Sequence, residues 1–79
     1  MKSNKKQTLT EDIHFFTAGL SGNLITVWQE DPAGVYCEIG RGYVEAYTSK
    51  YVRVRNLQSG TKSLYSRDVT MFQTDWFYL

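Results

Sequence analysis

The chain has 79 residues and a formal net charge of +1, which leaves room for one hydrophobic core but not for two. Its hydrophobic content of 42% is too high for a disordered protein. No apolar run is long enough to cross a membrane or to follow the basic amino terminus as a secretory signal, and Cys37 has no cysteine partner for a disulfide. We expect a flexible basic tail over residues 1–7, one folded domain over residues 8–79, and a reducing, cytoplasmic setting.

Positive charge is concentrated in the middle of the chain. Residues 41–67 contain six Lys and Arg residues and a single acidic residue, Glu45. Residues 8–40 and 68–79 contain seven acidic residues and neither Lys nor Arg. Local fields rather than net charge govern the encounters of such a molecule, so we expect one basic surface region.

The first structured segment is predicted to be a short helix. Residues 8–11 follow a Thr-x-x-Glu pattern, which has the spacing of a capping box. Leu9, Ile13 and Phe16 then recur at helical spacing, which predicts a helix from about Leu9 to Phe16 that ends before Gly19. The alternative is an irregular arm laid over the domain by the apolar side chains of the same segment.

From Leu24 onward the pattern alternates as in β-strands. Leu24–Glu30 and Val35–Ile39 are predicted strands, and Asp31-Pro32-Ala33-Gly34 between them has the residues of a type I turn. Gly40 and Gly42 follow, where glycine is typical of a bulge or a sharp bend in a curling sheet.

The alternation assigns the side chains of this hairpin to two faces. Four residues are expected inward and four outward: Ile25, Val27, Cys37 and Ile39 point to the core, and Trp28, Glu30, Tyr36 and Glu38 point away from it. An outward Trp beside carboxylates could form part of a cage for a cationic side chain, although a Trp covering the rim of a barrel is the commoner arrangement. An inward Cys37 would be an inert small hydrophobe.

The next hairpin allows a prediction of register. A loop of three residues sets Tyr47 opposite Tyr51, whereas a shorter loop sets Tyr47 against Val52 and scrambles the two faces. The favoured ladder pairs Ala46 with Val52, Glu45 with Arg53, Val44 with Val54 and Tyr43 with Arg55. Apolar residues then face each other on one side of the sheet and opposite charges on the other.

A second three-residue loop, Gln58-Ser59-Gly60, is predicted to follow, with Gly60 in the left-handed conformation. Its register places Leu64 opposite Val54 on the inner face, and it places Tyr65 beside Arg53 on the outer face. After it, the sequence predicts a turn at 66–68, a strand over Val69–Phe72, a turn at 73–75 and an apolar end, Trp76-Phe77-Tyr78-Leu79.

Five to six short strands joined by tight turns predict an all-β fold, with the possible short helix at its amino terminus. The expected architecture is a small SH3-like barrel or a strongly curled antiparallel sheet. The order of a long early loop, a three-stranded meander, a short turn and a last strand resembles an SH3-like barrel, as in KOW or Tudor modules. The resemblance covers about residues 24–72 and concerns the fold alone.

The predicted outer face combines tyrosines with cations, which nucleic acids exploit. Its candidate nucleic-acid-binding residues are Arg53, Arg55, Arg67, Lys50, Lys62, Tyr43, Tyr47, Tyr51 and Tyr65. Arg and Lys neutralise phosphates, and aromatic rings stack on bases without sequence preference. The same residues could instead only stabilise the sheet through cross-strand pairs. A third interpretation is a protein-binding adaptor or inhibitor of the accessory type encoded by phages and mobile elements, with Trp28, Tyr36 and Trp76 as anchors.

Catalytic and cofactor signatures are not found. His14 is the only histidine and lies in an apolar segment, which is typical of a structural role, and Cys37 alone cannot complete a metal site. No base is spaced to activate a Ser or Thr nucleophile. Gly40-Arg41-Gly42 is too short for a phosphate-binding loop. The sequence therefore predicts a non-enzymatic binding module without a cofactor, a metal or a small-molecule substrate.

Overall fold

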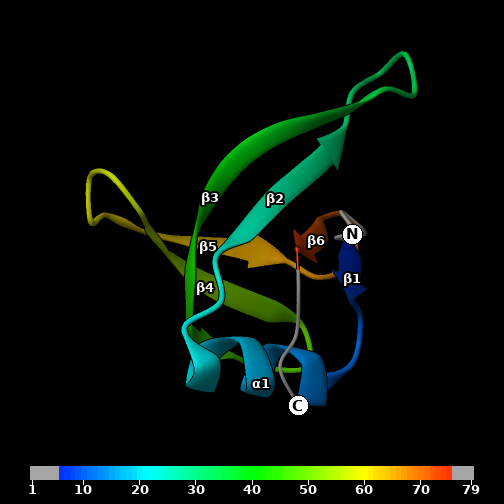
Figure 1. The fold of residues 1–79 in the computed structure, drawn as a ribbon. Helices are drawn as coiled ribbons and strands as arrows, with labels where there is room; N and C mark the ends of the chain where they lie inside the picture. The colour runs from blue at the N-terminus through cyan, green and yellow to red at the C-terminus, as the bar shows by residue number, and fades with distance from the viewer. Residues whose placement is uncertain (1–5, 76–79) are drawn as a thin grey trace, which may run out of the picture.

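The computed structural model describes residues 6–75, which form one six-stranded antiparallel sheet and a single helix (Figure 1). In chain order the elements are β1 (Gln7–Leu9), α1 (Asp12–Ser21), β2 (Ile25–Glu30), β3 (Tyr36–Tyr47), β4 (Tyr51–Asn56), β5 (Lys62–Ser66) and β6 (Met71–Thr74). The strands lie in the order β1-β6-β2-β3-β4-β5. The mainly β fold with one short helix confirms the prediction from the sequence.

Helix α1 connects two strands that lie on either side of β6. Because β1 and β2 both pair antiparallel with β6, they run parallel to each other, and a parallel connection requires a crossover segment. The helix packs against β3 at Gly19, where a Cβ would lie 3.3 Å from the carbonyl oxygen of Val44. A small residue at this position allows the helix to approach the strand closely.

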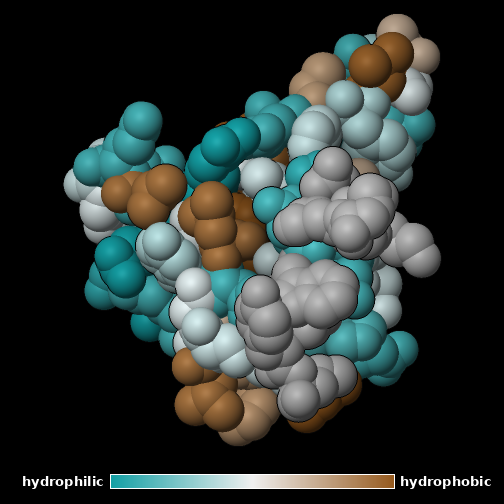
Figure 2. All heavy atoms as spheres, in the orientation of Figure 1, coloured by the Kyte–Doolittle hydropathy of each residue, from teal (hydrophilic) through white to brown (hydrophobic). Residues whose placement is uncertain are grey.

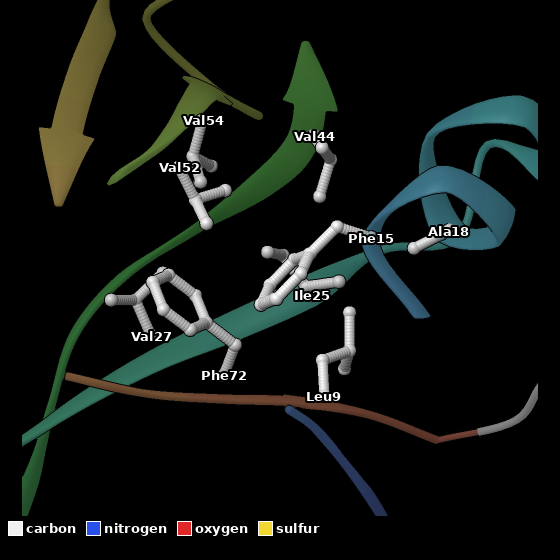
Figure 3. Packing of buried hydrophobic residues seen from close by; sticks show 9 residues of the cluster. All are labelled: Leu9, Phe15, Ala18, Ile25, Val27, Val44, Val52, Val54 and Phe72. Atoms are coloured by element: carbon white, nitrogen blue, oxygen red, sulfur yellow. The ribbon is translucent and has the colours of Figure 1, made fainter. Parts of the chain in front are cut away.

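The core lies between α1 and the inner face of the curled sheet (Figure 3). Nine buried hydrophobic residues from six elements form it: Leu9, Phe15, Ala18, Ile25, Val27, Val44, Val52, Val54 and Phe72. The rings of Phe15 and Phe72 meet edge to face, with centroids 5.3 Å apart. This contact joins the helix to β6 and is favourable beyond the apolar area that it buries.

The helix begins and ends later than the sequence predicts. Leu9 belongs to β1, where it pairs with Phe72 and is buried, so Thr8 and Leu9 of the expected capping box lie in the sheet. The N-cap is Glu11, and the Nδ1 atom of His14 accepts hydrogen bonds from the backbone N–H groups of Thr10 (2.9 Å) and Glu11 (3.0 Å). The helix continues through Gly19 to Ser21 and ends at Gly22, which has φ = 66°.

The apolar face predicted for this helix is also wrong. Phe15 and Ala18 are the buried residues of α1, whereas Ile13 and Phe16 are exposed. Leu9 lies in β1 and not on the helix, so the face that meets the sheet is the one that carries Phe15 and Ala18.

Gly40 and Gly42 lie within a long strand and not between two strands. β3 curves strongly between a first half that pairs with β2 and a second half that pairs with β4 (Figure 1). Gly42 pairs with both Ile25 and Asn56, and a Cβ there would overlap the carbonyl oxygen of Arg55. The bend expected at these glycines is thus present without a break in the strand.

The turn between β2 and β3 is confirmed. The N–H of Gly34 donates to the carbonyl oxygen of Asp31 (2.9 Å), and the Asp31 carboxylate accepts from the backbone N–H groups of Ala33 and Val35. The hairpin extends beyond the rest of the sheet (Figure 1).

The inward residues predicted for this hairpin are correct in β2 and wrong in β3, whereas Tyr36 and Glu38 are exposed as predicted. Ile25 and Val27 are buried, but Cys37 and Ile39 are exposed. The β2–β3 register shifts after Val27, and the hairpin extends beyond the core. Neither face of this half of β3 therefore packs against the core.

The β3–β4 ladder contains a bulge that the sequence did not predict. The observed pairs are Gly42 with Asn56, Tyr43 with Arg55, Val44 with Val54, Ala46 with Arg53 and Tyr47 with Val52. The two pairs predicted far from the loop are confirmed, and those predicted near the loop are wrong by one residue. Glu45 has no partner in the ladder and absorbs the difference as a bulge. Beyond the bulge the faces of β3 are exchanged, so Ala46 is exposed and Tyr47 packs against the core, while β4 keeps its predicted inner face.

The predicted β4–β5 register is wrong by one residue throughout. The observed pairs are Tyr51 with Ser66, Val52 with Tyr65, Arg53 with Leu64, Val54 with Ser63 and Arg55 with Lys62. The Asn56 side chain accepts hydrogen bonds from the N–H groups of Gln58 and Ser59, and the Asn56 N–H donates to the Thr61 carbonyl (2.7 Å). These bonds hold a loop of four residues, 57–60, although Gly60 has the predicted positive φ (75°). An even loop exchanges the two faces of β5.

The last strand is displaced from its predicted position. β6 covers Met71–Thr74 and not Val69–Phe72, because Gln73 and Thr74 pair with β1 on one side and with β2 on the other. The preceding turn covers 67–69. Residues 1–5 and the predicted apolar end, Trp76–Leu79, lie outside the described residues.

Candidate nucleic-acid interface

The outer face of β3, β4 and β5 carries a cluster of cations. Val52 and Val54 are buried, so the alternation of β4 directs Arg53 and Arg55 to the opposite, exposed face. Lys62 pairs with Arg55 across the β4–β5 ladder and joins the same face because of the observed register. Three of the predicted cationic residues are therefore brought together.

Glu45 lies at the centre of this cluster. Its carboxylate is 3.6 Å from Arg53 Nε, 3.2 Å from Arg55 Nε and 3.3 Å from Lys62 Nζ. The Glu45 side chain is only 22% exposed, whereas its three partners are 46–55% exposed. One carboxylate thus holds three cations on one face and leaves an excess of two positive charges. We call Glu45, Arg53, Arg55 and Lys62 the basic cluster.

Two of the predicted tyrosines lie beside the basic cluster. The Arg55 guanidinium stands 5.6 Å from the ring centroid of Tyr43, which is a cation–π contact. Tyr51 is 45% exposed and lies on the same face of β4 as Arg53. Lys50 is exposed in the loop between β3 and β4. Tyr43 and Tyr51 therefore add two aromatic rings to the face, and Lys50 adds a cation in the loop that precedes β4.

Tyr47 and Tyr65 are not part of this face, which corrects the prediction. Both are partly buried and pack against the core. The ring of Tyr47 lies 6.2 Å from that of Phe15, and the ring of Tyr65 lies 6.2 Å from that of Phe72. The bulge turns Tyr47 inward, and the four-residue loop turns Tyr65 inward. The hydroxyl of Tyr65 occupies the space where a side chain at Gly40 would lie.

Arg67 has a structural position and not an exposed one. Its side chain is 13% exposed. Nη1 donates to Asp12 Oδ1 (2.7 Å) and to the Thr48 carbonyl (2.6 Å), and Nη2 donates to the Thr10 carbonyl (3.0 Å). Its guanidinium also stands 4.6 Å from the ring centroid of Phe15. Arg67 therefore ties the start of α1 to the β3–β4 loop and does not present its charge to a ligand.

Leu64 is the outer-face residue that the sequence interpretation missed. It is 64% exposed and lies opposite Arg53. The signal that could have revealed it is Asn56, because an Asn at the end of a strand can bond to the backbone N–H groups two and three residues later and so lengthen the loop.

The aromatic residues proposed as protein anchors do not form one site. Trp28 is half-buried, and its Nε1–H donates to Thr26 Oγ1 (2.8 Å). Tyr36 is 50% exposed and lines an open hollow of about 380 Å³ together with Glu30, Asp68 and Met71. The third proposed anchor, Trp76, lies outside the described residues.

The β2–β3 hairpin carries a separate, fully formed ion pair. Arg41 donates two hydrogen bonds to the Glu38 carboxylate, from Nε (2.8 Å) and from Nη2 (3.0 Å). These bonds hold the pKa of Glu38 below its ordinary value of 4.5. Arg41 is therefore neutralised locally and does not belong to the basic cluster.

The structure also shows where the histidine and the cysteine considered as possible catalytic or metal-binding residues lie. His14 caps the helix, as its predicted structural role requires, and Cys37 is exposed, which contradicts its prediction as a buried residue. Within residues 6–75, no group of three or more His, Cys, Asp or Glu side chains is placed to hold a metal ion. In the same part of the chain, no helix has the length and the apolar content that crossing a membrane requires.

Comparison of the chain with protein families, with curated proteins and with solved structures finds no match.

Proposed function

We propose that this protein is a non-enzymatic binding module that contacts nucleic acid through the outer face of β3, β4 and β5. The observation that carries the proposal is the convergence of Arg53, Arg55 and Lys62 on one carboxylate. Three cations around a single carboxylate have a net charge of +2. A phosphate can accept hydrogen bonds from the N–H groups of these side chains that do not donate to Glu45. The cations are ordered before the ligand arrives, which lowers the entropic cost of binding.

Single-stranded nucleic acid is the form that suits this face. The half-buried Tyr43 and the exposed Tyr51 lie beside the arginines, and aromatic rings next to cations provide stacking surfaces for unpaired bases. A base that stacks on Tyr43 would compete with Arg55 for the ring and release its guanidinium toward phosphate. No group on this face is arranged for the readout of base edges, so binding should be tolerant of sequence.

We further propose that the curled sheet, which is open because β1 and β5 are its edges, is of the SH3-like type. Strands β2 to β6 follow one another along the chain, and β6 returns to pair with β2, which is the connectivity that an SH3-like barrel requires. A cytoplasmic location belongs to the same proposal, since it gives the protein access to nucleic acid and keeps the exposed Cys37 reduced.

The proposal is tested by reversing the two central charges. The double variant Arg53→Glu, Arg55→Glu should fold, because both side chains are about half exposed, and it should lose binding to a labelled single-stranded oligonucleotide at low salt. Arg41→Glu is the matched control for the single variants Arg53→Glu and Arg55→Glu, because it makes the same charge change at one arginine outside the basic cluster. For the wild type, about three or four engaged cations predict a slope of log K against log salt of about −2 to −3. Equal affinity of the wild type and the double variant would refute the assignment.

A further inference from the structure

Strand β5 forms an open edge of the sheet. It lies at one end of the strand order, and within residues 6–75 only β4 pairs with it (Figure 1). The opposite edge is β1, which is three residues long, whereas β5 has five residues. An edge strand presents a row of N–H and C=O groups to which another strand can bond. β5 is therefore the longer of the two edges at which the sheet can be extended.

The hydrogen bonds at the two ends of β5 show which of its backbone groups point outward. The Asn56 N–H donates to the Thr61 carbonyl (2.7 Å), and the Arg67 N–H donates to the Lys50 carbonyl (2.8 Å). In an antiparallel ladder, residues that bond to the neighbouring strand alternate with residues that point away from it. Both ends thus assign the odd-numbered positions to β4. The even-numbered residues of β5 direct their N–H and C=O groups away from the sheet, and these are Lys62, Leu64 and Ser66.

β5 lacks most of the features that prevent an edge strand from pairing. Bulges, prolines and several charges are the usual protection. β5 pairs with β4 without a register shift, contains no proline, and has one charged residue, Lys62. Leu64 at its centre is 64% exposed, and Leu57 in the preceding loop is 45% exposed. Figure 2 shows hydrophobic surface where Figure 1 draws β5 and this loop. The edge is therefore open to a further strand.

The outward residues of β5 are complementary to those of a second β5. In an antiparallel pair centred on Leu64, Leu64 lies opposite its own copy and Lys62 lies opposite Ser66. All three outward residues then form bonded pairs, and each pair exchanges two hydrogen bonds. A register shifted by two residues leaves one outward residue of each strand without a partner in the other strand. A shift by four residues sets Lys62 opposite Lys62 or Ser66 opposite Ser66. One register is therefore favoured.

We propose that β5 pairs antiparallel with β5 of a second copy, about a two-fold axis at Leu64, and joins the two sheets into one. The same edge serves both copies, so this contact is closed and produces a dimer rather than a filament. A contact through one five-residue strand is smaller than the interfaces of about 1,200–2,000 Å² that hold stable complexes. The dimer should therefore be weak, with a Kd of about 10–100 µM.

The charges of the basic cluster determine how salt affects this dimer. The two-fold axis is perpendicular to the joined sheet, so the basic clusters of both copies lie on the same face. The offset of four residues between Lys62 and its copy corresponds to about 14 Å along the strand. This distance exceeds the Debye length of about 8 Å at physiological ionic strength, so the repulsion is largely screened there and grows at low salt. Dimerisation should therefore weaken as salt is removed.

The pairing of β5 does not rest on the proposed function, because it depends on the backbone edge of the strand. The two proposals also respond to salt in opposite ways, since removing salt strengthens binding to phosphates. Failure of one is thus distinguishable from failure of the other.

Sedimentation equilibrium of the full chain at physiological salt tests the dimer. Between about 10 µM and 1 mM protein, the wild type should pass from monomer to dimer and no further. Leu64→Lys should weaken dimerisation at least tenfold, because it sets two like charges directly opposite each other. Val69→Lys is the matched control, because Val69 is 61% exposed and lies outside β5, and this variant should dimerise like the wild type. Far-UV circular dichroism confirms that each variant is folded.

Disulfide cross-linking tests the register. Cys37 is exposed, so the experiment uses a Cys37→Ser background. Leu64→Cys places two thiols on Cα atoms about 5.5 Å apart, a distance that suits a disulfide. Lys62→Cys is the control, because its two copies lie about 14 Å apart along the strand. In a glutathione redox buffer, Leu64→Cys should form a covalent dimer and Lys62→Cys should not.

Three results would overturn the proposal. The first is a wild type that remains monomeric at about 1 mM. The second is dimerisation that Leu64→Lys and Val69→Lys change equally, because the contact then lies elsewhere on the molecule. The third is equal cross-linking of the two cysteine variants, which contradicts a register centred on Leu64.

Discussion

Replacing Glu45 with glutamine separates the two roles that its position implies. Glu45 holds Arg53, Arg55 and Lys62 at 3.2–3.6 Å, and it is the one acidic member of the basic cluster. Glu45→Gln keeps the shape of the side chain and removes its charge. Because the three cations then lack their common partner, the variant should be less stable but should bind nucleic acid more tightly.

The expected magnitudes follow from the exposure of the partners. Ion pairs between half-exposed side chains contribute about 0–1 kcal/mol each, and three pairs that share one carboxylate are not additive, so we expect a loss of about 1 kcal/mol. For a domain of this size, that loss lowers the Tm by about 4–8 °C. Repulsion between a carboxylate and a phosphate roughly 6 Å apart is about 0.7 kcal/mol at the dielectric constant of water. Its removal should raise the affinity about threefold.

The assay is fluorescence anisotropy with a labelled single-stranded oligonucleotide at low salt, accompanied by a thermal melt. Glu38→Gln is the matched control, since it makes the same change in net charge on the β2–β3 hairpin, next to Arg41 and outside the basic cluster. The prediction requires a larger gain in affinity for Glu45→Gln than for Glu38→Gln. Equal gains would mean that only net charge matters, and a loss of affinity would mean that Glu45 itself positions the binding residues.

Three further substitutions test other parts of the structure. Arg67→Lys keeps the charge but removes the guanidinium that donates to two carbonyls and a carboxylate. Urea denaturation should show that the free energy of unfolding falls by about 2 kcal/mol. An unchanged midpoint would contradict the role of Arg67 in joining α1 to the β3–β4 loop. Gly42→Ala would force a Cβ into the Arg55 carbonyl and should cost about 3 kcal/mol or more, so a Tm within a few degrees of the wild type would refute the close approach. The lowered pKa of Glu38 means that its pair with Arg41 stabilises the protein at pH values above 4.5 and that this contribution is lost as the pH falls through the lowered pKa. Glu38→Gln should therefore be less stable than the wild type at pH 7 and should lose less stability on acidification to pH 3, as measured by urea midpoints.

The sequence predicted the features that depend on local chemistry. The type I turn at Asp31, the bend at the two glycines of β3, the positive φ of Gly60 and the inner face of β4 all follow from neighbouring residues, and the structure confirms them. The face of β4 was predictable because Val52 and Val54 alternate with Arg53 and Arg55, and only one orientation buries the valines.

The features that were predicted wrongly depend on a single extra residue in a loop or bulge, or on pairing between residues that are distant in the sequence. The bulge at Glu45 and the four-residue loop after Asn56 each change a register by one residue, and such a change exchanges the faces of a strand. The start of α1 depends on the pairing of Leu9 with Phe72, two residues that are far apart in the sequence. The local capping pattern was therefore outweighed by a strand pairing that no local pattern reports.

The corrected registers change the character of the candidate site. Tyr47 and Tyr65 turn inward and add aromatic area to the core, while Lys62 moves onto the outer face beside Arg55. The face is therefore less aromatic and more cationic than the sequence indicated. Electrostatic contact with phosphates should supply most of the affinity, and stacking should contribute through Tyr43 and Tyr51 alone. Because one carboxylate, that of Glu45, pairs with all three cations, substitution of this single residue should change the affinity of the face for phosphates without changing the strand pairing of the sheet.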